Sequence, residues 1–321
     1  MLSAAPHRRA PFPVTALAAV ALLSGCSGDG ARPAGAAAEP AVPAIPTIAE
    51  ATTLRFPLDA FEATDEQNRT LARAQGILTS RCMARFGFRY QAPQNSSPQQ
   101  PRGGSRRFGV TDLKTASQYG YRNPRTAGSE PPRDTGRGTL SRTAEIVLLG
   151  EPGLKPEDLP ASQQEAESEG GSATEANGKR IPFGGCTRES FLKLYAPKPG
   201  TVDLLYVFNL RNQADSEYRG DSRVRAVDRR WSDCMAESGY RTRDPHNAAE
   251  ELGLGEARSG PEAISAAKAD VLCKHRVNLV GVHYAVLSAY EQRAVERNAE
   301  TLKLAKDQLD ERLRLAAGLT G

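Results

Sequence analysis

The sequence predicts an all-α protein: an irregular helical domain with long loops, built from two related units that are each clamped by a disulfide. Three observations predict this class. Apolar residues recur every three or four positions in several segments, which is the period of one helix face. Residues that cap helices precede these segments, and glycine follows them. The same cysteine motif ends two of the segments, whereas no run alternates apolar and polar residues as a strand would.

The first 25 residues have the three parts of a lipoprotein signal peptide. Arg8 and Arg9 supply the positive charge, and residues 14–23 supply a short apolar stretch. A transmembrane helix needs about twenty apolar residues, so this stretch is too short to span a bilayer. It runs into Leu-Ser-Gly-Cys26, which resembles the lipobox of bacterial lipoproteins. The resemblance implies cleavage before Cys26 and a lipid on its thiol, with the membrane as the partner of that lipid.

Residues 26–53 are rich in Ala, Pro and Gly and predict a disordered tether, because such a segment buries little apolar surface. The next range, 54–200, is predicted to form the first helical unit. Its first helix begins after Thr64, because Thr64 and Gln67 form a capping-box pattern. Gly87 suits the left-handed residue just past a helix end, so the helix is predicted to stop there.

Two insertions in the first unit, 91–107 and 156–180, are predicted to be flexible loops without regular structure. The first is rich in Gln, Ser, Pro and Gly, and the second is acidic and has no apolar periodicity. The short helices predicted around them occupy 108–121 (capped by Thr111 or Asp112), 141–150, and the stretch from a cap at Thr187 to Pro197.

Residues 201–321 are predicted to form the second helical unit. Its first helix is predicted to span 202–239, with a kink at Gly220. The stretch 262–317 is helix-forming throughout. A break near 296–300 would make this stretch an antiparallel helix pair, and without a break it would be one long helix. The sequence leaves both possibilities open.

Two segments, 82–90 and 234–242, share the pattern Cys-Met-Ala-x-x-Gly-aromatic-Arg. Each copy is predicted to lie at the C-terminal end of a helix, where the glycine ends the helix and the aromatic residue packs back. One more cysteine follows each copy along the chain. We infer an internal duplication in which the first copy is enlarged by the insertions.

The chain has five cysteines, and a lipid on Cys26 would leave four. An even number in an exported protein indicates two disulfides, which four cysteines can form in three ways. The duplication favours Cys82–Cys186 and Cys234–Cys273, one bridge in each unit. A metal site with four thiolates is disfavoured, because such sites use closely spaced cysteine pairs. Neither a metal nor another cofactor is predicted.

The lipobox, the repeated motif and Trp231, three residues before Cys234, form a combination that resembles uncharacterised secreted lipoproteins of actinomycetes. The resemblance covers most of the mature chain loosely. It implies a helical extracytoplasmic protein, and it implies no particular activity.

The charge balance argues against a nucleic-acid partner. The chain has 42 Lys and Arg residues against 38 Asp and Glu residues, and the signal peptide contributes Arg8 and Arg9 but no acid. The mature chain would therefore be close to neutral, whereas nucleic-acid binding requires a clustered basic excess.

Recognisable catalytic motifs are missing from the sequence, which has no glycine-rich phosphate loop after a strand and no nucleophile elbow. The mature chain has three histidines, His246, His275 and His283. The last two lie about two turns apart on one predicted helix, which is too far for both to bind one metal directly. They are predicted at the edge of a seam between helices.

These observations predict a non-enzymatic binding or scaffolding protein on the extracytoplasmic face of the cell membrane, held there by the lipid on Cys26. Its partner would be an envelope protein or a glycan. The alternative is an extracytoplasmic hydrolase that acts on cell-wall material through side chains brought together by the fold. A deep cleft that joins a histidine to an acid and a hydroxyl would favour the hydrolase.

Overall fold

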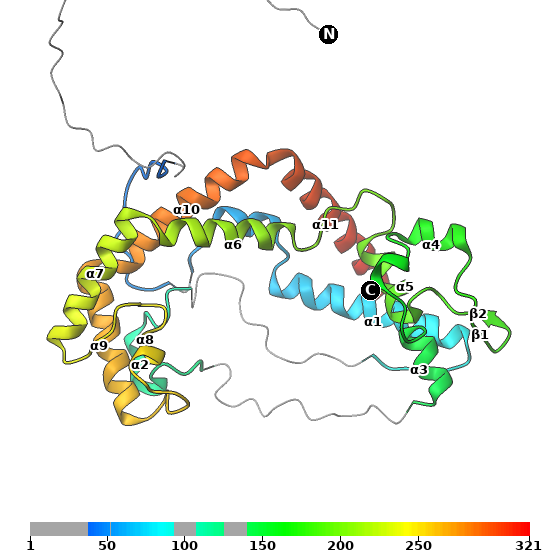
Figure 1. Ribbon diagram of the computed structural model, residues 1–321, viewed down its shortest axis with the longest axis horizontal. Helices are drawn as coiled ribbons and strands as arrows, with labels where there is room; N and C mark the ends of the chain where they lie inside the picture. The colour runs from blue at the N-terminus through cyan, green and yellow to red at the C-terminus, as the bar shows by residue number, and fades with distance from the viewer. Residues whose placement is uncertain (1–37, 52, 93–106, 125–139) are drawn as a thin grey trace, which may run out of the picture. The chain divides into compact units, whose positions relative to one another are not determined.

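The computed structural model describes residues 38–51, 53–92, 107–124 and 140–321. Helices dominate these ranges, and the sheet found among them is a hairpin of two short strands (Figure 1). The predicted all-α class is therefore confirmed. The predicted signal peptide and Cys26 lie outside the described residues, as does most of the predicted loop 91–107. From Glu39 to Gly321 the chain forms one compact unit.

In chain order, the α-helices are α1 (Asp65–Arg85), α2 (Leu113–Tyr119), α3 (Arg142–Leu149), α4 (Gln163–Glu169), α5 (Gly185–Tyr195), α6 (Tyr206–Arg219), α7 (Ser222–Glu237), α8 (Ala248–Glu251), α9 (Pro261–Val277), α10 (Leu279–Arg297) and α11 (Ala299–Thr320). The 3-10 helices are η1 (Pro57–Phe61) and η3 (Pro156–Asp158), and the antiparallel strands are β1 (Glu175–Ala176) and β2 (Lys179–Arg180).

Side-chain caps form the predicted helix starts. Thr64 Oγ1 accepts the N–H of Gln67, and the Gln67 side chain accepts the N–H of Thr64, so the capping box of α1 is present. Asp112, not Thr111, caps α2 through its carboxylate. Thr111 instead accepts the N–H of Ala51. These caps satisfy N–H groups of the first helical turns that have no partner within the helix.

Helix α5 begins at Gly185, two residues before the predicted cap at Thr187. The difference comes from a close approach between helices. The start of α5 packs on the end of α3, and a Cβ atom on Gly185 would lie 2.4 Å from the backbone nitrogen of Gly150. Only glycine fits there, and Gly185 also has a φ of 71°. The predicted end before Pro197 is correct, since the last helical residue is Tyr195.

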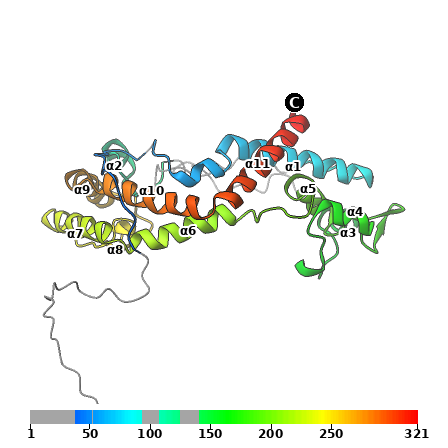
Figure 2. The same ribbon diagram turned by 90° about the horizontal axis from the view of Figure 1, so that it is seen from above.

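Polar residues break the predicted long helices of the second unit. Asp221 separates α6 from α7, where the sequence predicts only a kink at Gly220, because its buried carboxylate caps α7. Asn278, in the left-handed region at φ 53°, separates α9 from α10, and Asn298 separates α10 from α11. The stretch 262–317 is thus neither one helix nor an antiparallel pair, since α11 packs mainly on α1 (Figures 1 and 2).

The prediction that 26–53 is a disordered tether is wrong for residues 38–51. These residues are placed against the helices and make specific contacts. The Glu39 carboxylate accepts two hydrogen bonds from Ser222 at the start of α7. Further along, Ala51 is fully buried. Hydrogen bonds to backbone and carboxylate groups hold this segment in place although it has few apolar residues, which is why composition alone does not predict it. The earlier part of the tether lies outside the described residues.

The segment 156–180, predicted as a loop without regular structure, contains α4 and the hairpin. Ser162 caps α4 by accepting the N–H of Glu165. Asn177 and Gly178, both at positive φ, form the two-residue turn between β1 and β2. Both signals are present in the sequence as Ser-x-x-Glu and Asn-Gly, but the acidic, glycine-rich composition of the segment hides them.

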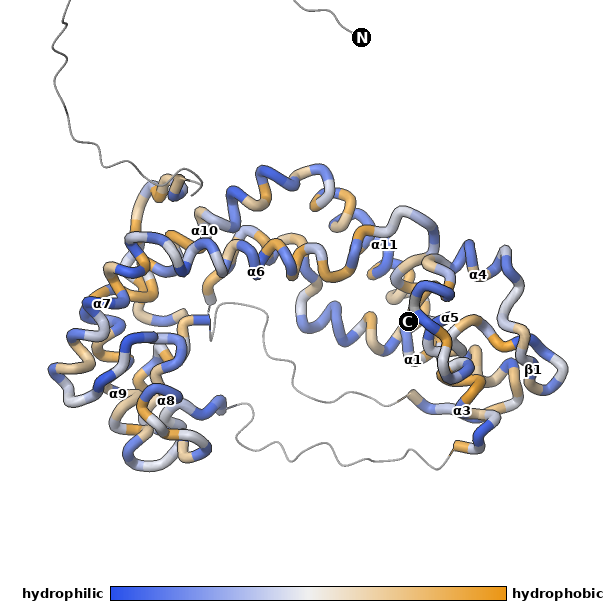
Figure 3. Tube along the Cα trace, viewed as in Figure 1, coloured by the Kyte–Doolittle hydropathy of each residue, from blue (hydrophilic) through white to orange (hydrophobic). Residues whose placement is uncertain are grey.

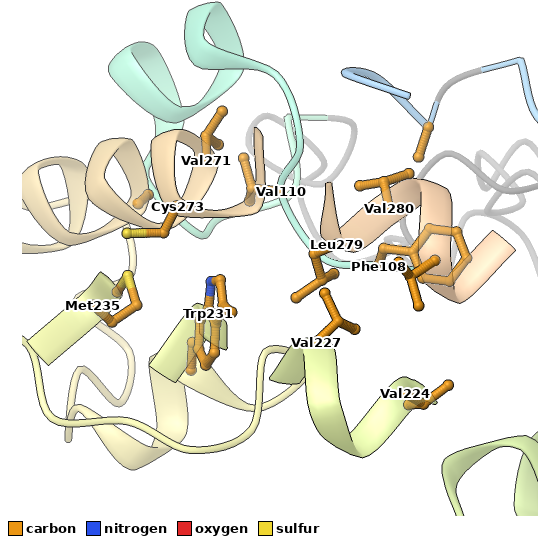
Figure 4. Close-up of a cluster of buried hydrophobic side chains, with 14 of the residues drawn as sticks. Phe108, Val110, Val224, Val227, Trp231, Met235, Val271, Cys273, Leu279 and Val280 are labelled. Carbon is orange, nitrogen blue, oxygen red and sulfur yellow. The ribbon is translucent and has the colours of Figure 1, made fainter. Parts of the chain in front are cut away.

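Buried apolar residues form several clusters that do not follow the predicted division into 54–200 and 201–321. The largest cluster lies between α2, α7, α9 and α10, around Trp231 (Figure 4). Another surrounds the first cysteine motif and is formed by α1, α3, α5 and the hairpin. A third joins α1 and α5 to α11. The boundary at residue 200 is therefore crossed in both directions, because residues 107–121 pack with the second unit and α11 packs with the first.

Candidate functional site

The two disulfides that the duplication predicts are present. Cys82 is joined to Cys186 and Cys234 to Cys273, with Cα–Cα distances of 5.5 and 5.6 Å. All four residues are buried. The bridges therefore lie within the apolar clusters and act as clamps on the folded chain.

Each bridge joins two antiparallel helical segments. In the first pair, Thr79 lies one turn before the motif cysteine and Ser190 one turn after its partner, and their hydroxyls are 2.8 Å apart. In the second pair, Asp228 of α7 contacts His283 of α10, the helix that directly follows α9 and also packs on α7 (Figure 1). The shared antiparallel arrangement supports a relation between the two units.

The two motif helices also end in the same way. Gly87 and Gly239 follow them at φ 80° and 88°, and the next residue donates its N–H to the carbonyl of the motif methionine. These hydrogen bonds are Phe88 to Met83 at 3.1 Å and Tyr240 to Met235 at 2.9 Å. The geometry is a Schellman motif, in which a glycine in the left-handed region allows the chain to bond back over the last turn. Both methionines are fully buried, so the shared methionine, glycine and aromatic residue have the same places in the two helix ends.

A cleft of about 360 Å³ opens beside the first disulfide. We call it the hairpin cleft, because β2 and α4 form one side of it and the ends of α1 and α5 form the other. Helix α4 is hydrophilic along its length (Figure 3) and has no buried residue. The charged residues that line the cleft are Arg85, Glu167, Lys179, Arg180, Glu189 and Lys193.

Local hydrogen bonds position these walls. The first N–H of α4 donates to the carbonyl of Ala196 at 2.8 Å, which docks α4 on the end of α5. Asn177 Nδ2 donates to the carbonyl of Phe86 at 2.6 Å, and Lys179 Nζ donates to that of Arg85 at 2.7 Å. The last carbonyls of a helix have no partner within it. The hairpin therefore serves as a side-chain cap on the C-terminal end of α1.

The lining of the cleft has more positive than negative charge, with four cations and two carboxylates. The Glu189 side chain, 9% exposed, accepts hydrogen bonds from both Arg85 and Lys193. Glu167 lies on α4 and is exposed. Arg180 is also exposed and forms no ion pair within the described part of the chain. Glu189 carries one negative charge and contacts two of the cations, so the lining keeps a net positive charge to which Lys179 and Arg180 of the hairpin contribute.

Two of the three histidines meet in the core of the second unit. The ring centroids of His246 and His283 are 5.4 Å apart. His283 Nε2 lies 2.8 Å from an oxygen of Asp228, and His246 Nε2 lies 3.2 Å from the hydroxyl of Tyr218. The structure thus brings histidines to an acid and a hydroxyl, as the hydrolase alternative requires. His275 is not part of this cluster and bonds to backbone carbonyls instead.

The histidine cluster is buried at His283 and partly exposed at His246. The rings of Phe108 and Tyr218 pack edge-on against His283. Burial and the neighbouring His283 lower the pKa of His246 to about 3, so its ring is neutral at physiological pH. His283 is therefore a polar part of the core.

The sequence does not predict the residues of the hairpin cleft, because its clearest motifs point to cysteines and histidines. One signal could have located part of it. Asn177-Gly178 is a strong hairpin signal, and the pair Lys179-Arg180 follows it directly. Glu189 on α5 follows soon after the hairpin, but its contact with Arg85 of α1 spans 104 residues, which sequence order alone does not reveal.

No known protein family, curated protein or solved structure matches this chain. Within the described residues, no group of three or more histidine, cysteine or carboxylate side chains is placed to hold a metal ion. None of the helices that the structure describes is both long and apolar enough to cross a membrane. The chemistry of the cleft is therefore the basis for a functional interpretation.

Proposed function

We propose that the protein is a lipid-anchored, extracytoplasmic lipoprotein that binds a component of the cell envelope in the hairpin cleft. The lipobox resemblance at Cys26 and the resemblance to actinomycete lipoproteins support the location. The hairpin cleft is the observation that carries the binding role. It is concave and partly apolar, and several charged groups converge on it, which is the usual form of a ligand site.

The charge pattern of the cleft favours binding over catalysis. Hydrolysis of a glycosidic bond requires one protonated carboxylic acid that donates to the leaving group. Glu189 accepts hydrogen bonds from two cations, Arg85 and Lys193. Its oxygens are therefore already engaged within the wall of the cleft, which suits a role in positioning these cations.

The proposed location is tested by the variant Cys26→Ala. We expect it to lose metabolic labelling with a fatty acid and to leave the membrane fraction, whereas Ser24→Ala, which keeps the cysteine, should retain both. If Cys26→Ala stays membrane-bound and is processed like the wild type, the lipobox interpretation is wrong.

The proposed binding role is tested by filling the cleft without changing its charge. Ala166 lines the cleft on α4, so Ala166→Trp should weaken co-sedimentation of the full chain with isolated cell envelopes. Ser168→Trp is the matched control, because Ser168 is exposed on the same helix and does not line the cleft. Equal binding by both variants would refute the role of the cleft. Release of soluble fragments from the envelopes by the wild type would support the hydrolase instead.

A further inference from the structure

We infer that the ligand of the hairpin cleft is an acidic glycan, which places its carboxylate or phosphate on Arg180 and a sugar ring on the apolar floor. This inference rests on the proposed binding role and adds the chemical class of the ligand. Three features of the cleft lead to it: the cation Arg180, the composition of the floor and the volume.

The first feature is the difference between the cations. Arg85 and Lys193 are already engaged by Glu189 on the α1–α5 side. Arg180 is exposed without an ion pair in the described ranges, and a guanidinium presents a planar set of donors that matches a carboxylate or a phosphate. Lys179, the preceding residue of the same strand, bonds to the carbonyl of Arg85 instead, and successive side chains of a strand point to opposite faces. Arg180 is therefore the hairpin cation that remains for an anionic group.

The second feature is the floor. Phe86 and Leu192 line the cleft and are buried, whereas Pro182 and Phe183 line it and are partly exposed. A flat, partly exposed apolar surface next to charged donors suits a ligand with a C–H face and polar edges. A sugar ring has this form, whereas a small inorganic anion would leave the floor uncovered.

The third feature is the size of the site. A volume of about 360 Å³ lies at the low end of the range of about 300–1,000 Å³ for small-ligand sites. It accommodates a small segment of a glycan, whereas a protein partner would need a surface of roughly 800 Å² on each side. The cleft is thus better matched to an acidic sugar unit than to a protein.

Calorimetric titration of the full chain, purified in non-ionic detergent, tests the inference. The probes are oligogalacturonate, as a carboxylate glycan, and a neutral malto-oligosaccharide of the same length. We expect oligogalacturonate to bind and the neutral probe not to bind. Arg180→Glu should weaken oligogalacturonate binding by at least roughly tenfold, the usual cost of losing a charged hydrogen bond. The wild type should also bind more weakly as salt rises, and Arg180→Glu should lose most of this salt dependence.

Arg314→Glu is the matched control, because Arg314 is exposed on α11 and does not line the cleft. It should bind like the wild type, so an equal loss in both variants would mean a general charge effect and would overturn the inference. Binding of inorganic phosphate or of phosphatidylglycerol vesicles in place of oligogalacturonate would also overturn it, since the sugar would then play no part.

The two proposals fail in different ways. If Ala166→Trp loses envelope binding but Arg180→Glu keeps it, the cleft binds a ligand whose acidic group is not needed for recognition. Only the inference about the acidic glycan then fails. If Ala166→Trp binds envelopes normally, both the proposed function and the inference fail.

Discussion

The two disulfide-clamped units have the same helix ending but different surroundings. In the second unit, the motif helix carries Trp231 three residues before its cysteine, fully buried and bonded through Nε1 to Asp270 at 2.9 Å. In the first unit, the same position is Thr79, which bonds to a serine hydroxyl. The second unit has a continuous core around its motif, whereas the first has a cleft beside its own.

The difference shows what the insertion has added. The motif, its Schellman ending and the bridge provide a stable clamp that both units use. Only 39 residues separate the bridged cysteines of the second unit, and 104 separate those of the first. The additional residues include α4 and the hairpin, and these form one side of the cleft. In the second unit the clamp is thus part of the core, whereas in the first unit it supports the helices that line the cleft.

Removing each disulfide tests the clamps directly and should have the largest effect on the free energy of unfolding. In the chain-entropy account, closing a loop of 104 residues stabilises a fold by about 4.7 kcal/mol and one of 39 residues by about 4 kcal/mol. We expect the Cys82→Ala/Cys186→Ala chain to be slightly less stable than Cys234→Ala/Cys273→Ala in guanidinium unfolding. A much larger cost for the second pair would show that local packing, not loop length, determines what a bridge contributes.

Truncating the side chain three residues before each motif cysteine should lower the stability of the protein by different amounts in the two units. Trp231→Ala should cost about 4 kcal/mol, because it leaves a large cavity in the core, whereas Thr79→Ala should cost about 1 kcal/mol for one hydrogen bond. Equilibrium unfolding followed by far-UV circular dichroism measures both. Similar losses in the two variants would contradict the view that the second unit holds the main core.

Acid should loosen the second unit before the first. The pKa of His246 is about 3 in the folded chain against an ordinary 6.5, so the unfolded chain binds this proton more tightly. Stability should therefore fall as pH falls from 6.5 toward 3, by at most about 1.4 kcal/mol per pH unit. Residues 54–200 contain no histidine, and Trp231 is the only tryptophan.

Fluorescence of Trp231 should therefore change at a higher pH than hydrogen exchange in α1, and His246→Gln should reduce the difference. If α1 exchanges first on acidification, the assignment of the acid-sensitive region to the second unit is wrong.

The smallest expected effect tests what the units share. Gly87 and Gly239 have nearly the same positive φ, and alanine in that conformation costs about 1 kcal/mol. Gly87→Ala and Gly239→Ala should therefore lower the unfolding free energy by similar amounts in denaturant titrations. A large difference between them would show that the two helix endings are not equivalent.

Features that depend on neighbouring residues could be predicted, and features that depend on distant contacts could not. The capping box at Thr64 and the Schellman glycines are local patterns, and the repeat to which these glycines belong is enough to pair the cysteines. Asp221 could not be recognised as a helix break, because its burial depends on Tyr290 of α10, whose hydroxyl bonds to it. The cleft depends in the same way on contacts between segments about 100 residues apart, such as Asn177 with Phe86.

The packing of α11 on α1 and α5 has a consequence for biosynthesis. The apolar faces that meet there include Leu71 and Ala74 of α1 and Leu309 of α11. The ribosome makes α1 and α5 well before α11, so the part of the apolar face of α1 that packs on α11 has no partner until α11 has been made. A chain that stops before α11 would keep that part exposed, and exposed apolar surface of this kind leads to aggregation or chaperone capture. The cleft-bearing unit thus reaches its final form only when α11 has been made.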